Sequence, residues 1–147
     1  MSLMEKLTAD MKEAMKHGEK ERLSVIRLVR GAVRQAEIDG KKTLSDDEII
    51  GVITKEVKMR RDSIEEFERG NRADLVEKTQ AEIAILMPYL PEQLSADEVR
   101  RIVEAAVSEV GATTAKDMGK VMGVLMPRVK GRADGKLVNE IVRSLLK

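Results

Sequence analysis

Apolar residues recur along most of the chain at the three- and four-residue spacing of amphipathic helices. Four such runs predict helices over about 3–17, 19–39 and 46–69, and from just after Asn71 to Leu86. Three shorter runs follow, centred on 99–110, 118–129 and 137–146. No segment of any length alternates between apolar and polar residues, as a half-buried strand would. The pattern therefore predicts an all-α protein.

Capping signals support these helix boundaries. Ser2, Ser45 and Ser95 each precede a glutamate by three residues, which is the capping-box pattern of a helix start. Glycines stand where the periodic runs end, as expected after a helix C-terminus: Gly18, Gly40, Gly70, Gly111 and Gly131.

The segment MPYLPEQLS interrupts the pattern. Pro88 and Pro91 are expected to push Met87 and Leu90 out of helical angles, and Tyr89 is expected to anchor this joint by packing. We therefore expect two helical domains. The first is a bundle of about four helices at 1–93, and the second is a small three-helix module at 94–147.

Composition narrows the chemistry. Apolar residues make up 42% of the chain, but there is one Phe, one Tyr and no Trp, so aliphatic side chains must fill the core. Without cysteine and with a single histidine, neither a disulfide nor a zinc site is expected. His17 has no nucleophile and acid to complete a catalytic set. We predict no cofactor, no metal and no catalytic residue.

The location of the protein is also suggested by its N-terminus. The first 16 residues interleave acids and bases and contain no apolar core of a secretory signal. The longest apolar stretch, around AILMPYL, is short and contains Pro88. These features predict a cytoplasmic protein without a membrane partner.

Charge is unevenly distributed along the chain. Residues 111–147 contain eight Lys/Arg and three Asp/Glu, a balance of +5. The whole chain carries +1, so the first 110 residues sum to −4. The basic excess therefore lies at the C-terminal end of the chain.

The stretch MGKVMGVLMPRVKGRADG, residues 118–135, holds unusual helix residues. Gly119 and Gly123 lie on one flank of the predicted helix together with Lys130. Each glycine costs about 1 kcal/mol of helix stability relative to alanine. Either another helix packs closely there, which is the simpler explanation, or the backbone of a ligand approaches there. Pro127 would kink the helix or mark its last turn.

A basic connection follows this helix. Its cations are opposed only by Asp134, which is expected to cap the last helix: Arg128, Lys130, Arg132 and Lys136. A helix N-terminus beside four cations suits a phosphate, although Asp134 would itself occupy the free amides. GRADGK is not a nucleotide-binding P-loop, since no strand precedes it and no Ser or Thr follows.

A second basic stripe is expected on the helix at 19–39. It consists of Lys20, Arg27, Arg30 and Arg34. The simpler interpretation is an exposed face with ion pairs; the alternative is a second surface that contacts phosphates.

Three segments together resemble the GatB/YqeY family, over essentially the whole chain: SIEEFERGNRADLVEK, LMPYLPEQLS and DMGKVMGVLMPRVKGRADGKLVNEIV. The last is similar to the tail domain of the B subunit of the glutamine-dependent aspartyl/glutamyl-tRNA amidotransferase. The resemblance implies two helical domains, the second shared with a tail that contacts tRNA. It also implies a relation to a carbon–nitrogen ligase that uses glutamine as amido-N donor. This chain lacks the catalytic body of that enzyme.

The resemblance thus implies a non-catalytic accessory protein that binds tRNA or other structured RNA. The positions carried over as RNA-facing or turn-forming are Gly119, Lys120, Gly123, Lys130, Gly131, Arg132, Ala133, Asp134 and Lys136. With Arg128 of the basic connection added, the expected RNA-binding residues are Gly119, Lys120, Gly123, Arg128, Lys130, Arg132 and Lys136. The near absence of aromatics argues against stacking on single strands and leaves phosphate and shape contacts. Two alternatives stay open. One is a helical interaction module that docks on an amidotransferase or aminoacyl-tRNA synthetase, and the other is a component of an active amidotransferase complex.

Overall fold

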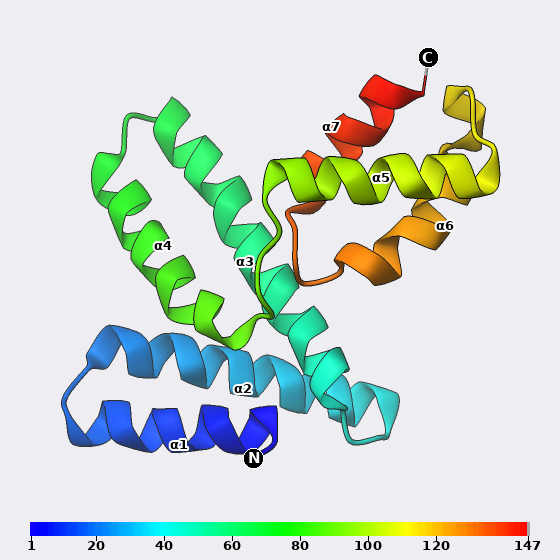
Figure 1. Ribbon diagram of the computed structural model, residues 1–147. Helices are drawn as coiled ribbons and strands as arrows, with labels where there is room; N and C mark the ends of the chain where they lie inside the picture. Colours follow the sequence, from blue (N-terminus) through cyan, green and yellow to red (C-terminus); the bar gives the residue numbers. More distant parts are fainter. Residues whose placement is uncertain (147) are drawn as a thin grey trace. The chain divides into compact units, whose positions relative to one another are not determined.

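The structure, a computed structural model, describes residues 1–146. The elements of the first 90 residues are α1 (Leu3–Lys16), α2 (Lys20–Gly40), α3 (Asp46–Arg69), α4 (Ala73–Leu86) and the 3-10 turn η1 (Met87–Tyr89). Those that follow are α5 (Ala96–Val110), the 3-10 turn η2 (Ala115–Asp117), α6 (Met118–Val129) and α7 (Gly135–Leu145). No strand occurs in this described range, so the predicted all-α class is confirmed (Figure 1).

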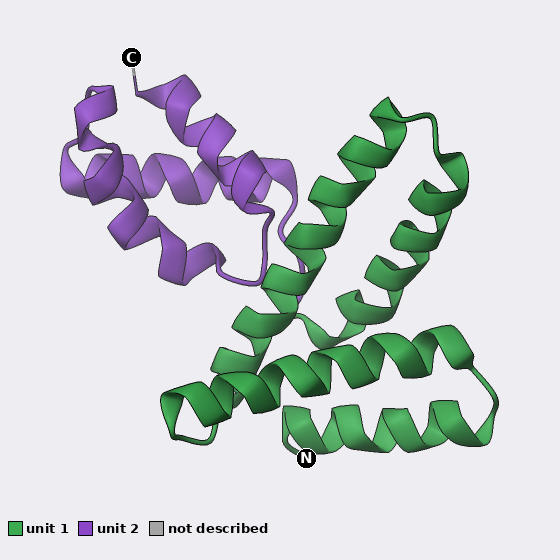
Figure 2. Cartoon of the chain, turned by 180° about the vertical axis from the view of Figure 1, so that it is seen from behind, with its two compact units in different colours: residues 1–90 green, residues 91–147 purple. Residues whose placement is uncertain are grey.

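The chain divides into two compact units, Met1–Leu90 and Pro91–Lys147 (Figure 2). We call them the N-terminal and C-terminal units. Each has a core of its own, which its own helices supply. The core of the first consists of Leu7, Val25, Ile26, Val29, Val33, Ile49, Ile53, Val57, Leu86 and Tyr89. The core of the second consists of Val99, Val103, Ala106, Val121, Leu125, Val129, Val138, Ile141, Val142 and Leu146.

In the N-terminal unit, two helical hairpins pack together, α1 with α2 and α3 with α4 (Figure 1). Arg60 of α3 ties the second hairpin. Its guanidinium lies 3.0 Å from a carboxylate oxygen of Glu56 and 3.0 Å from one of Glu82 on α4. All three side chains are largely buried. A buried cation needs such partners, because leaving it unpaired is strongly destabilising. The ion pairs therefore belong to the packing of this unit.

The predicted helix starts are present, with one difference. Ser45 and Ser95 form reciprocal capping boxes with Glu48 and Glu98. Ser2 accepts a hydrogen bond from the Glu5 amide, but the exchange is one-way. The amide of Leu3 instead donates to Asp46 at 3.1 Å. The start of α1 is therefore held by the start of α3.

The joint between the units differs from the prediction at one residue. Met87 is helical, with φ −55° and ψ −39°, so the expectation that Pro88 pushes it out of helical angles was wrong. The reason is that α4 runs directly into η1, where proline fits the first turn and its missing N–H is not needed. Leu90 is extended, as expected. Tyr89 is 7% exposed and its hydroxyl donates to Asp10, which confirms its anchoring role.

Candidate functional site

The solvent side of α6 is the most unusual surface of the C-terminal unit. Val121, Leu125 and Val129 are buried and define the inner side of the helix. The positions that point away from them, including one residue a turn earlier, are exposed. They are Lys116, Gly119, Lys120, Gly123, Pro127 and Lys130. We call this set the α6 outer face. Residues 118–133 contain no Asp or Glu, so this surface holds cations, glycines and a proline but no acid, and the exposed Met126 borders it.

The two glycines of the α6 outer face lie open. A Cβ built at Gly119 or at Gly123 would meet no atom within 4 Å apart from the adjacent residues and the backbone of its own helix. The interpretation that a second helix packs closely against them is therefore wrong within the C-terminal unit. Pro127 lies in the last turn of α6, which continues to Val129. Proline has no N–H to donate to the carbonyl four residues earlier, so the Gly123 carbonyl lacks that intrahelical partner.

The basic connection after α6 has a fixed backbone. The side-chain amide of Gln93 donates to the Gly131 carbonyl at 2.8 Å, and the Leu94 amide donates to the Arg132 carbonyl at 2.8 Å. Gly131 has a φ of +74°, the left-handed conformation predicted after a helix end. The PEQL segment therefore holds this turn in place. Sequence reasoning missed Gln93; its only signal was its position in the family-like motif.

The start of α7 is capped as predicted. The carboxylate of Asp134 accepts a hydrogen bond from the Lys136 amide at 3.1 Å. Because this carboxylate already occupies the helix N-terminus, the free amides of α7 do not form an anion site. The basic turn must act through its side chains.

The four cations of the predicted turn lie in different surroundings. Arg128 donates to both carboxylate oxygens of Glu109 at 2.8 and 3.1 Å, and this hydrogen bonding raises the pKa of Arg128. Arg132 is half-buried, whereas Lys136 is exposed in the first turn of α7. Lys130 is exposed and makes no ion pair with any residue in the described part of the chain. Of the four, Lys130 is thus the most available to a ligand.

Lys120 and Lys116 complete the cationic rim of the α6 outer face. Hydrogen bonds from the Thr113 and Thr114 amides lower the pKa of Asp117, and Lys120 adds to that effect. Asp117 is thereby engaged at the start of α6. Lys116 lies in η2, before the helix that the sequence predicted, and one turn ahead of Lys120.

A groove between α5 and α6 adjoins the α6 outer face. Its volume is about 540 Å³. It is lined by Arg101, Arg128, Arg132, Ile102, Ala105 and Pro127. We call it the arginine groove. Arg101 could not be found from the sequence, because its role depends on α5 lying beside α6.

The predicted stripe on α2 is divided by the structure. Lys20, Arg27 and Arg34 are exposed. Arg30 is half-buried and turns toward α1, where its guanidinium lies 3.0 Å from the sulfur of Met11. Three of the four cations therefore share the solvent side of α2.

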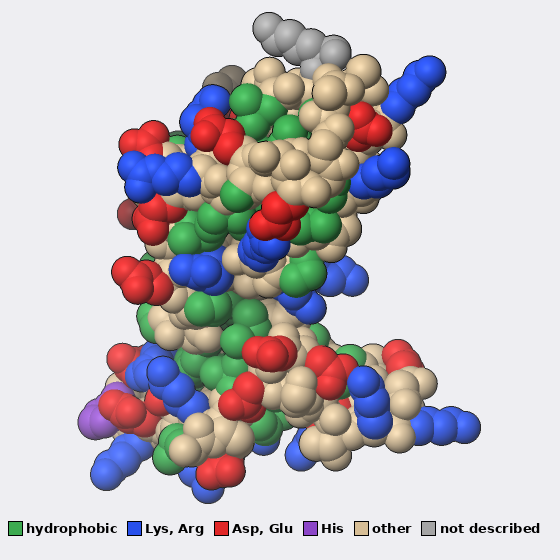
Figure 3. Space-filling model, turned by 45° about the vertical axis from the view of Figure 1, so that its right-hand side comes forward, with side chains coloured by type: hydrophobic (Ala, Val, Ile, Leu, Met, Phe, Trp, Pro, Cys, Tyr) green, Lys and Arg blue, Asp and Glu red, His purple; other side chains and the backbone are tan. Residues whose placement is uncertain are grey.

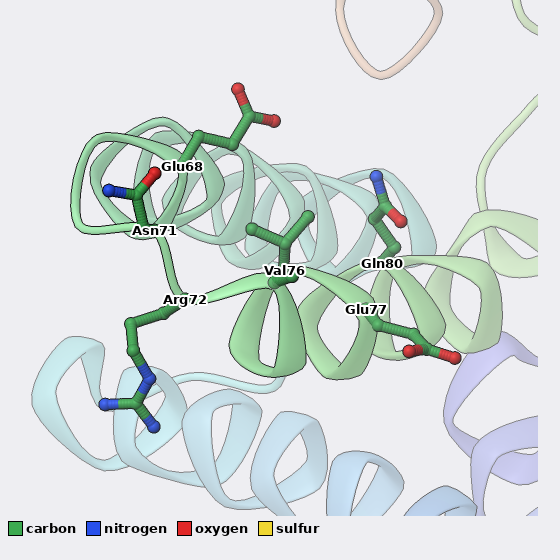
Figure 4. Close-up of a pocket in the computed structure, with 7 residues that line it drawn as sticks. Glu68, Asn71, Arg72, Val76, Glu77 and Gln80 are labelled. Carbon is green, nitrogen blue, oxygen red and sulfur yellow. The ribbon is translucent and has the colours of Figure 1, made fainter.

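Hollows in the N-terminal unit bring together mixed charges. One of about 560 Å³ lies at the turn between α3 and α4. In Figure 4 the side chains of Glu68, Arg72 and Glu77 point in different directions, and Arg72 is held by Asp74 at 2.9 Å. On the face drawn in Figure 3, positive and negative side chains are interspersed. Neither view shows a convergent set of groups.

Within residues 1–146, no three His, Cys, Asp or Glu side chains group closely enough to hold a metal ion. No helix of that range is long and apolar enough to cross a membrane. His17 caps the end of α1 and is exposed.

These features define an all-α protein of two helical units, one of which carries a basic helix face with two open glycines. The sequence matches the Yqey-like protein family over residues 4–146. The chain therefore belongs to that family, as its motifs indicated.

Curated relatives are fungal proteins named "Altered inheritance of mitochondria protein 41, mitochondrial". The one from Pyrenophora tritici-repentis is 33% identical over 98% of this chain and 81% of its own length. That from Kluyveromyces lactis is 34% identical over 82% of this chain and 70% of its own. That from Lachancea thermotolerans is 35% identical over 71% of this chain, which spans about half of that relative, 55%.

These names contradict the predicted cytoplasmic location. The relatives are named as mitochondrial proteins. The prediction relied on the interleaved charges of the first 16 residues, which argue only against a secretory signal. That pattern carries no information on other destinations.

Proposed function

We propose that this protein is a non-catalytic accessory that binds structured RNA, tRNA above all, on the α6 outer face. The observation that carries the proposal is an exposed helix side made of open glycines and cations without a single acid. An ordinary solvated helix face mixes both signs. Here no side chain stands over the two glycines, so a phosphate chain can come close to the helix and to the cations beside it.

The type of RNA follows from what the surface lacks. With one Phe and one Tyr, the chain has almost no rings on which unpaired bases could stack in series. Folded RNA presents phosphates and 2′-hydroxyls at fixed spacing and is recognised mainly by shape. The 12 residues of α6 give a helix of about 18 Å, long enough to follow several consecutive phosphates. Amidotransferase- or synthetase-related tRNA handling is the setting that the family resemblance supports.

The experiment is a measurement of tRNA binding against salt concentration. If Lys116, Lys120, Lys130 and Arg132 each neutralise one phosphate, the log–log slope is near −3 and affinity falls about 10²-fold between 50 and 200 mM salt. In the variant Lys120→Ala/Lys130→Ala the slope should flatten by about two phosphates' worth, for all tRNAs alike, because phosphate contacts do not read sequence.

The matched control is Lys12→Ala/Lys16→Ala, which removes the same charge from exposed positions of α1. An unchanged slope in the α6 variant would remove this face from the RNA site. Absence of tRNA binding by the wild-type chain at 50 mM salt would overturn the proposal in favour of docking on a protein.

A further inference from the structure

We infer that the arginine groove holds a single unstacked nucleotide, with its phosphate at the arginines and its base against the apolar wall. The inference deepens the proposed function and rests on it: RNA lying along the α6 outer face would place one splayed-out nucleotide in this groove. Pro127 makes the connection, since it belongs both to the outer face and to the groove lining.

The phosphate position is set by Arg101 and Arg132. Neither makes an ion pair within the part of the chain that the structure describes. Both act electrostatically on Glu98, whose carboxylate accepts a hydrogen bond from the Ser95 amide at 3.1 Å. That bond chiefly lowers the pKa of Glu98, and the two arginines add to the effect. Glu98 is therefore engaged by the helix cap, and two guanidinium forks remain for a phosphate, whose oxygens they match in geometry.

Arg128 has a different part in the groove. Glu109 holds its guanidinium through both carboxylate oxygens, across α5 and α6. The pair fixes the distance between the two helices along one side of the groove. The planar guanidinium still offers a face for stacking on a base.

The rest of the lining suits a base. Ile102, Ala105 and Pro127 form an apolar wall, and no aromatic ring is among the lining residues. The hollow of about 540 Å³ is open to solvent, so it would cover one face of a base and not enclose it. The carboxylate of an acidic peptide would pair with the arginines but would leave the apolar wall exposed to water. A nucleotide satisfies both, which favours it over an acidic peptide.

The first test measures binding of AMP, adenosine and inorganic phosphate to the full chain by NMR titration. AMP should bind more tightly than either of its parts. Arg101→Ala should weaken AMP about tenfold, since it removes a charge-assisted hydrogen bond. The matched control is Arg100→Ala, which removes the same charge from an exposed neighbour on α5 that does not line the groove. Equal AMP binding by the two variants would overturn the inference.

The second test uses RNA hairpins with and without one bulged nucleotide. The wild-type chain should prefer the bulged hairpin, Arg101→Ala should abolish the preference, and Lys120→Ala/Lys130→Ala should weaken both hairpins equally. If the preference survives in Arg101→Ala while both hairpins bind, the groove inference fails and the RNA proposal stands. If neither hairpin binds but AMP does, the RNA proposal fails instead. Displacement of AMP by polyglutamate at lower concentration than by RNA would overturn the nucleotide assignment.

Discussion

Two helices of this protein, one in each unit, turn a row of cations and open glycines toward solvent. On α2 the exposed positions in register are Lys20, Ser24, Arg27, Gly31, Arg34 and Ile38, which we call the α2 outer face. Like Gly119 and Gly123 of α6, Gly31 has open space where a Cβ would lie, outside the backbone of its own helix. In cations and accessibility the two faces are alike.

They differ in how near a ligand can come to the backbone. On α2 a single glycine stands between the long side chains of Arg27 and Arg34, so a bound polymer is kept at the distance of those side chains. On α6 two glycines and Pro127 form a continuous strip, with lysines only at its rim. The two faces therefore do not differ in their number of cations. They differ in how much of the backbone is left uncovered, which is more on the α6 outer face. This difference is the reason for placing RNA on α6 and not on α2.

The largest expected effect comes from reversing charge on the two faces. Lys120→Glu/Lys130→Glu should lower tRNA affinity by about 10³-fold at low salt, because two attractive phosphate contacts become repulsive ones. Arg27→Glu/Arg34→Glu makes the same change in net charge and should lower affinity by about tenfold, through long-range attraction alone. Fluorescence anisotropy with labelled tRNA measures both. If both variants lose the same tRNA affinity, the α6 outer face is not the preferred RNA site.

A smaller effect is expected from bulk placed on the glycine strip. Gly123→Leu should reduce tRNA affinity about tenfold by holding the RNA backbone off the helix, while the melting temperature stays within a few degrees because no neighbour is displaced. Gly31→Leu, its counterpart on α2, should leave tRNA affinity unchanged. If Gly123→Leu instead unfolds the C-terminal unit, the open strip of the structure is contradicted.

The smallest effect is on stability. Gly119→Ala, Gly123→Ala and Gly31→Ala should each raise the free energy of unfolding by about 0.5–1 kcal/mol, because alanine loses less backbone entropy in a helix and meets no clash here. Gly131→Ala is the contrasting control. Its φ of +74° is unfavourable for a side chain, so it should lower the free energy of unfolding by about 1 kcal/mol or more. Urea titration followed by circular dichroism measures the four variants.

The sequence by itself determined the helices and their ends. The capping boxes of Ser45 and Ser95, the left-handed Gly131 and the Asp134 cap all depend on groups within about four residues of one another. Such short-range interactions can be read from the sequence, because the groups that form them are close neighbours along the chain. The sequence also showed that Gly119 and Gly123 share one side of a helix. It did not show whether that side is exposed or packed against another helix, because both cases have the same periodicity.

Only the tertiary structure decided which groups meet across the chain. Arg128 meets Glu109 from 19 residues away, and Gln93 reaches the Gly131 carbonyl across 38 residues. Arg30 does not share the exposed side of the α2 stripe, because α1 places Met11 beside its guanidinium. Arg101 entered a groove because α5 lies along α6. These contacts depend on which helices pack together and on their rotation about their own axes. Burial of the whole core fixes that rotation, and periodicity along a single helix does not specify it.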